Sequence, residues 1–475
     1  MTRSNRSFES SGAQPIGAKG PKGGLERNAG IALAGALAVS FLLGGGGSRY
    51  GFANLAVLLA CLLALSFHRH GFAGFWTRAP RALAFLAGAS ILLPVLHLVP
   101  LPSGIWSALP SRDLVARSYE LANIEASAWA PLSVYPARSA LALLSLIVPL
   151  AVLATGWSVP RDRLILIGWI VVAVGIAQFL LGVVQVLSNG ETGLFYPENP
   201  MPGVLFGFFA NRNSTGLFLV GALTLAMLLP VPARMSRGAL FLRIACVVLL
   251  GLGVVLTRSR TALVLAVLPT ALWAWHALQA RRTADRSDSM QPARNRTFIL
   301  VVVALFIAAL GVTFASSSGR IGETLDRFET TRSDARAYIW DDATYSVERY
   351  WPVGAGMGTF DDVFQIDESL ENLSDRRAGR AHNDYLEIAI EAGGPGIILV
   401  ALWLLAIVWL AVRARRSKGR WIAWSGATIL LTIALQSITD YPLRNLSMLA
   451  LAGFALLLLI RFGERGPHRT ARKSA

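Results

Sequence analysis

Long apolar stretches alternate with short polar segments along most of the 475-residue chain. A transmembrane helix needs about 20 mainly apolar residues, and about twelve stretches meet this requirement. They are 29–46, 50–67, 82–101, 139–157, 164–187, 214–232, 239–257, 261–279, 298–315, 393–412, 421–439 and 446–460. The pattern predicts an all-α, polytopic membrane protein with about 12 transmembrane helices.

One polar stretch, 316–392, interrupts this alternation between the ninth and tenth predicted helices. Apolar residues recur at helical spacing from Asp334 to Tyr350, and 384–391 has the pattern of a second short helix. We therefore expect one long extramembrane loop whose short helices lie across the mouth of the bundle.

The composition excludes a soluble globular protein. Hydrophobic residues make up 54% of the chain and charged residues 15%, with a mean hydropathy of +0.52, and a water-facing surface needs more charge. The formal net charge of +16 would suggest nucleic acid in a soluble protein. Here the arginines cluster in short loops between apolar stretches, so we expect no nucleic acid. Cys61 and Cys246 lie in apolar stretches, which predicts unpaired, buried thiols.

The connecting segments also predict the orientation of the chain. With a cytoplasmic N-terminus, most Lys and Arg fall in inner segments, and the outer connections other than the long loop contain few. Both termini are therefore expected in the cytoplasm. The predicted division is a disordered basic tail (1–28), nine transmembrane helices (29–315), the outer loop (316–392), three more helices (393–460) and a second basic tail (461–475).

Arg212 stands between two amides, Asn211 and Asn213, just before a predicted transmembrane helix. A helix N-terminus beside a guanidinium is suited to binding an anion. The alternative is an arginine that anchors the helix at the membrane interface, with an ordinary cap.

Arg258 and Arg260 lie at a tight outer corner between two predicted helices, where positive charge is least expected. With Arg212 and Arg336 they could form a cationic cluster near the membrane surface. A diphosphate is the natural ligand for such a cluster, because guanidinium groups pair with its oxygens in a bidentate manner. Snorkelling to the membrane surface is the alternative.

His382 is the histidine that we place in an outer loop, and an imidazole suits general-base chemistry at neutral pH. Asp384, Glu387 and Glu391 are close enough in sequence to orient it. The alternative is a merely solvated histidine. No second His or Cys accompanies it, so we expect no metal site, although the loop carboxylates could hold a hard cation.

The order of these features resembles the O-antigen ligase and polysaccharide polymerase superfamily of bacterial inner membranes. The resemblance is close from about residue 206 to 396, and the hydropathy of the rest of the chain agrees with it. The matching phrases are Asn211-Arg212-Asn213, Ser259-Arg260, Arg336 with Trp340, Pro352 to Phe360 (PVGAGMGTF), His382-Asn383 followed by Tyr385-Leu386, and 391–396 (EAGGPG).

This resemblance implies a GT-C-like, metal-independent, inverting glycosyltransferase that uses no cofactor. The donor would be an undecaprenyl-diphosphate-linked glycan, and the acceptor a glycan or the lipid A core. The outer loop would then be a periplasmic catalytic loop of a multi-pass protein in the bacterial inner membrane.

The same resemblance implies roles for individual residues. His382 would remove the proton from the acceptor hydroxyl, with Asn383 and Asp384 positioning it. The other implied assignments are Arg212 and Arg260 on the donor diphosphate, Arg258 and Arg336 in support of them, and Asn211, Asn213, Tyr385 and Glu391 as further supporting residues, with Glu391 tying the loop to the next helix.

Two other classes of protein fit the same hydropathy pattern. A transporter or flippase of a lipid-linked or anionic substrate often has about twelve spans, although carriers usually place polar residues at mid-membrane depth. A receptor or scaffold without catalysis is the second. Within the family, lipid A-core ligation, polymerisation of repeat units and transfer to protein hydroxyls share one donor chemistry. The outer connection from Pro100-Leu101-Pro102 to Pro136, with Trp106 and Trp129, resembles that of exopolysaccharide polymerases.

Overall fold

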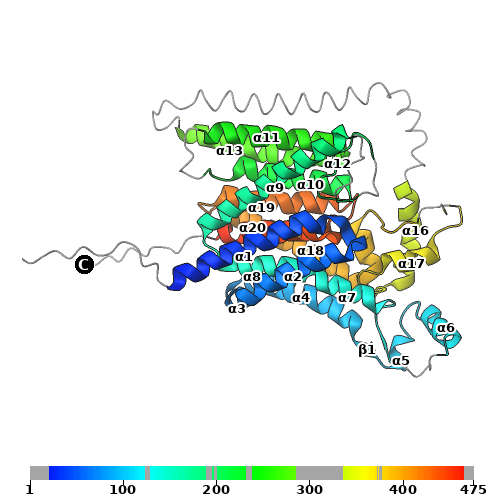
Figure 1. Ribbon diagram of the computed structural model, residues 1–475. Helices are drawn as coiled ribbons and strands as arrows, with labels where there is room; N and C mark the ends of the chain where they lie inside the picture. Colours follow the sequence, from blue (N-terminus) through cyan, green and yellow to red (C-terminus); the bar gives the residue numbers. More distant parts are fainter. Residues whose placement is uncertain are drawn as a thin grey trace, which may run out of the picture.

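The structure is a computed structural model whose described parts form a helical bundle with a smaller group of short helices at one end (Figure 1). The described residues are 21–123, 129–188, 195–196, 201–231, 238–284, 335–371, 373 and 377–464. Four predicted segments lie outside them: residues 1–20 of the first basic tail, the helix 298–315, residues 316–334 of the outer loop and residues 465–475 of the second basic tail.

Helices make up nearly all of the secondary structure in the described residues. In chain order, the helices and strands are α1 (Pro21–Leu43), η1 (Gly44–Arg49), α2 (Gly51–Phe67), α3 (Arg69–Arg78), α4 (Arg81–Leu98), β1 (Pro100–Leu101), α5 (Ser103–Trp106), α6 (Asp113–Leu121), β2 (Ala130–Pro131), α7 (Pro136–Ser145), α8 (Ile147–Trp157), α9 (Arg161–Leu187), α10 (Arg212–Leu228), α11 (Ala239–Leu256), α12 (Arg260–Leu265), α13 (Val267–Ala284), α16 (Ala335–Tyr350), α17 (Phe360–Asp367), α18 (Asp384–Ala414), α19 (Arg420–Gln436), η4 (Pro442–Arg444) and α20 (Leu446–Gly463). The two short strands pair antiparallel, with Pro100 opposite Pro131.

All the predicted transmembrane stretches except 298–315 coincide with helices. Eight helices of the described residues are long and apolar enough to cross a membrane, and α2 with the bent-away α3 would make a ninth. Helix α10 is shorter but also apolar, so the count of twelve stays a prediction. The first helix begins at Pro21, so the end of the predicted disordered tail is helical. Hydropathy identifies only the apolar part of a helix. The polar residues 21–28 at the start of α1 were therefore not predicted as helical.

Helices α10 and α20 form the centre of the bundle. Every residue of α10 from Ser214 to Leu228 is buried, and α20 is buried over most of its length. A helix that is apolar on all sides is stable only when other helices surround it. Gly216 allows this, because a Cβ there would collide with Ala262 of α12. The exposed apolar side chains belong mainly to outer helices such as α2 and the second half of α18.

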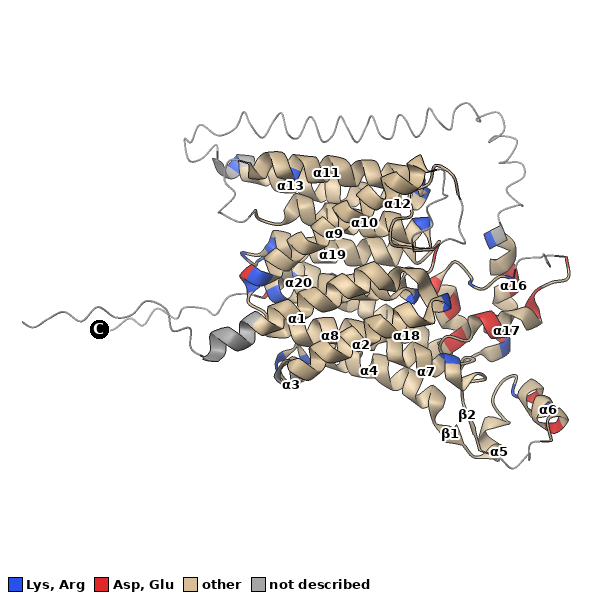
Figure 2. Ribbon diagram, in the orientation of Figure 1, with Lys and Arg blue, Asp and Glu red and all other residues tan. Residues whose placement is uncertain are grey.

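The two ends of the bundle differ chemically (Figure 2). Lys and Arg gather where α3, the α18–α19 turn and the end of α20 meet, which we call the basic end. Asp and Glu gather at the opposite end, around α16 and α17. His382 precedes α18 at that opposite end, which we call the His382 end.

Helix α18 joins the predicted short helix 384–391 to the predicted transmembrane helix 393–412 through a kink. At the kink, Gly393 has a φ of 54°, a left-handed conformation that disfavours residues with a Cβ. The residues before it are mostly buried, whereas the part after it faces outward.

A glycine-rich turn packs against this kink. Ala355 N donates to Ile390 O at 2.9 Å, and Gly394 N donates to Pro352 O at 3.0 Å. Gly354 also has a positive φ, and a Cβ there would collide with the Glu391 backbone. The glycines of these two segments therefore allow close backbone packing.

Replacing Gly393 with alanine is expected to destabilise the protein by at least about 1–2 kcal/mol, because an L-residue in the left-handed region is strained and its Cβ would collide with Pro352 O. Thermal denaturation in detergent measures the change. The matched control is Gly251→Ala in α11, where a Cβ meets nothing within 4 Å. The free energy of unfolding of this control variant should be unchanged or higher by about 0.5–1 kcal/mol. Equal melting temperatures for the two variants would contradict the role of the kink.

Candidate functional site

His382 is held in place by hydrogen bonds on both sides of it. Trp340 Nε1 donates to Ala381 O at 2.7 Å, and Ala381 N donates to Glu387 Oε1 at 3.0 Å. On the other side, Asn383 caps α18 by accepting from the amides of the first turn. His382 itself has a φ of 51°, and its side chain is 34% exposed. The imidazole is therefore fixed in direction but accessible.

The carboxylate that contacts His382 is Asp440, which is almost fully buried. His382 Nδ1 lies 3.3 Å from Asp440 Oδ1, and the ring packs edge to face on Tyr441 with centroids 5.0 Å apart. A carboxylate at Nδ1 favours the tautomer with its proton there, which leaves the Nε2 lone pair for a substrate. Burial and the neighbouring Asp440 raise the pKa of Tyr441 to about 12, so its hydroxyl remains neutral.

The predicted cationic cluster is assembled at the N-terminus of α10. Arg212 is the first residue of that helix, and Asn211 caps it by accepting from Asn213 N at 2.8 Å. Asn213 Oδ1 in turn accepts from Ser259 Oγ at 2.9 Å, and Ser259 stands between the other two arginines of the corner. A chain of short polar contacts thus joins two corners that are far apart in sequence.

The other three arginines act electrostatically on Arg212. Arg212 precedes the apolar part of α10, and its pKa is lowered by burial and then by the guanidiniums of Arg336, Arg260 and Arg258, in that order. Within the described residues, Arg212, Arg258 and Arg260 make no ion pair, so no carboxylate there neutralises them. Arg258 also has a positive φ of 51°. Such a concentration of guanidiniums suits an anionic ligand with several oxygens.

Asn211 connects the cluster to the histidine. Its Nδ2 lies 3.2 Å from Asp440 Oδ2, the same carboxylate that contacts His382 through its other oxygen. Thr261 and Thr439 approach within 3.5 Å beside this contact. The base candidate and the anion-binding candidates therefore belong to one surface at the His382 end.

A buried ionic cluster lies beside this surface. Asp384, Glu387 and Glu391 are spaced along one face of α18, and all three are buried. The guanidinium of Arg444 meets all of them: Nε lies 3.2 Å from Glu387 and 3.5 Å from Asp384, and Nη1 lies 2.7 Å from Glu391. Burial alone would lower the pKa of Arg444, but the three carboxylates outweigh it and raise the pKa. A second arginine, Arg380, pairs with Glu387 at 3.2 Å.

The structure changes how three predicted site residues are understood. Asp384, expected to position His382, instead accepts hydrogen bonds from Ser437 Oγ and Leu443 N. Asn383 acts as a helix cap, so it fixes the backbone at His382 and does not touch the ring. Tyr385 donates its hydroxyl to Ala434 O at 2.7 Å, which attaches α18 to α19.

Glu391, expected to tie the loop to the next helix, contacts both the loop and the link before α20. It accepts from Phe360 N and from Arg444. Asp440, Tyr441 and Arg444 were missed as site residues, although all three stand in the short link 440–445. Two opposite charges in such a short link between apolar helices were the available signal, since charges at this depth are costly without a partner.

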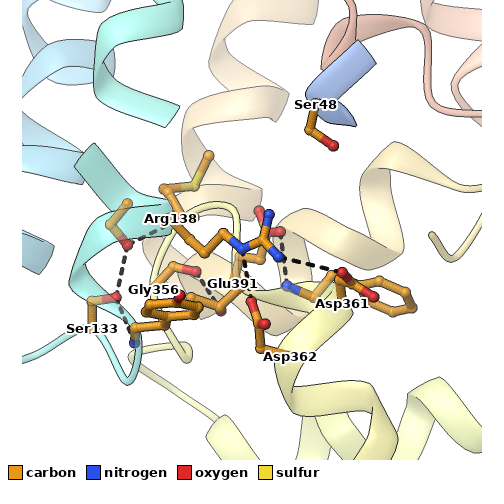
Figure 3. Close-up of polar contacts among 12 residues, drawn as sticks. Ser48, Ser133, Arg138, Gly356, Asp361, Asp362 and Glu391 are labelled. Carbon is orange, nitrogen blue, oxygen red and sulfur yellow. Dashed lines mark hydrogen bonds and ion pairs between the residues drawn. The ribbon is translucent and has the colours of Figure 1, made fainter. Parts of the chain in front are cut away.

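Residues between His97 and Ser139 contact the glycine-rich turn and α17. Ser139 Oγ donates to Met357 O, and Arg138 reaches Asp362 at 3.1 Å and Asp361 at 3.4 Å (Figure 3). Arg112 is buried and donates to Gly354 O, and His97 Nδ1 accepts from Met357 N at 3.0 Å. The contacts of Arg112, Ser139 and His97 hold the backbone of the glycine-rich turn in place.

Among the residues that the structure describes, no group of three or more His, Cys, Asp or Glu side chains is arranged to hold a metal ion. The buried carboxylates of α18 are paired with arginines instead.

Comparison with protein families identifies the central part of the chain. Residues 244–401 match the model of the O-antigen ligase family. That segment is similar to O-antigen ligases. The match confirms the resemblance inferred from the motifs and supports a membrane enzyme of the O-antigen ligase and polymerase type. It includes Arg258, Arg260, Arg336 and His382, whereas Arg212 and Asp440 lie outside it. No curated protein matches the chain.

Replacing Arg444 with methionine is expected to destabilise the protein by about 3–5 kcal/mol, because it leaves buried carboxylates without their partner. The unfolding free energy in detergent measures this loss. The control is Arg377→Met, whose side chain is 53% exposed and pairs with Asp361 at the surface. A surface pair of this kind is worth about 0–1 kcal/mol. Similar small losses for both variants would show that the buried cluster does not hold the site together.

Proposed function

We propose that the protein is a GT-C-like glycosyltransferase of the bacterial inner membrane with twelve spans. It transfers or polymerises an undecaprenyl-diphosphate-linked glycan onto a sugar hydroxyl at the periplasmic face. The observation that carries this proposal is the shared surface of His382 and the arginine cluster, joined through Asp440 and Asn211. A base and an anion site side by side are what displacement of a diphosphate requires.

The arginine cluster binds the donor diphosphate. As the bond between the anomeric carbon and the diphosphate oxygen breaks, negative charge grows on the leaving group. Arg212 and Arg260 stabilise that charge, with Arg258 and Arg336 in support, and this is the task that a divalent cation performs in other transferases. A metal-independent reaction is therefore part of the proposal.

His382 acts as the general base. Its Nε2 takes the proton of the acceptor hydroxyl as the oxygen attacks the anomeric carbon from the face opposite the diphosphate, which inverts the configuration. The proton remains on the imidazole, where Asp440 stabilises the imidazolium through Nδ1. The lipid diphosphate departs with the electrons of the broken bond.

Replacing His382 with alanine is expected to lower transfer about 10²- to 10⁴-fold, the usual contribution of positioned proton transfer. The first readout is the surface polysaccharide of a deletion strain on a gel, complemented with wild type or variant. Loss of long chains while single repeat units reach the lipid A core indicates a polymerase. Loss of all O-glycan from the core, with accumulation on undecaprenyl diphosphate, indicates a ligase.

Two further variants complete this test. His276→Ala changes a histidine of α13 that packs on Trp421, and it should complement fully. Asp440→Asn keeps the shape of the side chain but removes its charge, so it should be slow but not inactive. Full complementation by His382→Ala would refute the base role, and an unchanged profile in the deletion strain would refute the proposed function.

Replacing Arg212 with glutamine is expected to lower kcat/KM for the lipid-diphosphate donor roughly 10- to 100-fold, since a hydrogen bond to a charged group is worth about 1.5–3 kcal/mol. A transfer assay with purified protein and varied donor concentration measures it. Arg117→Gln, an exposed position on α6 outside the cluster, is the control and should leave kcat/KM unchanged. Equal values for the two variants would show that Arg212 does not contact the donor.

A further inference from the structure

A cavity of about 540 Å³ opens at the basic end of the bundle. It lies between α3, the turn from α8 to α9, and the end of α20. Arg78, Arg161 and Arg461 line it together with Trp157, Ser158 and Glu464. Nothing in the proposed reaction uses it.

The cavity is separate from the site at His382. Helix α20 begins at Leu446, next to the cluster around Arg444, and ends near the cavity at Gly463. An 18-residue helix is about 27 Å long, so roughly the thickness of a membrane separates the two places. A ligand of this cavity would lie at the opposite membrane surface.

The three arginines of the cavity differ in the number of protein partners that their guanidinium groups have. Arg461 donates to the carbonyl oxygens of Trp157 and Val159 and so completes the C-terminal end of α8. Arg161 donates through Nε to Arg461 O at 2.8 Å, and its Nη2 lies 3.9 Å from Glu464. Arg78 is exposed and makes no hydrogen bond or ion pair within the described residues. The lining therefore keeps an excess positive charge and guanidinium donors that face open space.

The surroundings place the cavity at the boundary between lipid and water. Helix α3 bends away from α2 by 81°, so it runs across the end of the bundle. It carries an aromatic group in which Phe75 packs edge to face on Trp76 and Trp157, and Phe72 beside it is 43% exposed. Tryptophan and exposed phenylalanine next to arginine are typical of the headgroup level of a membrane.

We propose that this cavity binds the phosphate headgroup of an anionic phospholipid. Arg78 and Arg161 pair with the phosphate oxygens, and the acyl chains lie against the exposed aromatic side of α3. The excess charge accounts for the preference for an anionic over a zwitterionic lipid. A free phosphate ion presents the same oxygens, but it gains nothing from the apolar surface of α3.

The test is a titration of the full-length protein in detergent with phosphatidylglycerol, followed by the rise in melting temperature, which yields an apparent Kd. Phosphatidylcholine and inorganic phosphate are titrated in parallel. Wild type should be stabilised by phosphatidylglycerol alone. The double variant Arg78→Gln with Arg161→Gln should bind about 30-fold more weakly, since each arginine near an anionic lipid is worth about a five-fold change.

A matched control removes the same charge from the same end of the molecule. Arg415 and Arg416 are exposed in the turn from α18 to α19, outside the cavity, and their double Gln variant should bind as wild type does. If the Arg161 change prevents folding, Arg78→Gln alone should show about a five-fold loss. An equal loss in both double variants, or no loss in either, would overturn the site. Equal stabilisation by inorganic phosphate would overturn the assignment to a lipid.

Discussion

The ionic contact between Arg444 and three carboxylates of α18 is the constraint on which the His382 end depends. Charges inside a membrane protein are stable only when partners satisfy them, and one guanidinium meets Asp384, Glu387 and Glu391 within 3.5 Å. Because each partner is rigidly attached, one to α18 and the other to the link before α20, these two segments have little freedom to separate. The positions of their neighbours follow from this pairing.

His382 immediately precedes α18, and Asp440 belongs to the same link as Arg444. Pairing the helix with the link therefore brings the imidazole to its carboxylate, although they are 58 residues apart. Asn211 extends the arrangement to α10 and to the arginine cluster. The proposed base and the proposed diphosphate site thus share one buried support, and a disturbance of that support would affect both.

This explains which parts of the molecule could be predicted from sequence. Apolar stretches of sufficient length indicated the helices, because each depends on local composition. Arg212, Arg258 and His382 were selected as candidates because they are charged or titratable residues at helix ends. The partner of His382 was not found, since sequence proximity favoured Asp384. Because Asn383 caps α18, however, Asp384 is the first residue of the helix, and its side chain is buried in the bundle. Only the tertiary pairing brings Asp440 to the ring.

Backbone strain occurs where the proposed chemistry takes place. His382 and Arg258 are two of the few non-glycine residues with positive φ among those described, and such conformations cost about 1–3 kcal/mol each. Each is held by hydrogen bonds of its neighbours: Ala381 to Glu387 beside the histidine, and Ser259 to Asn213 beside the arginine. Strain of this kind persists only where the surrounding contacts over-determine the backbone. The buried ionic cluster provides such contacts for His382, because Glu387 accepts from Ala381 N. The same packing therefore fixes the backbone of His382 and leaves its imidazole exposed.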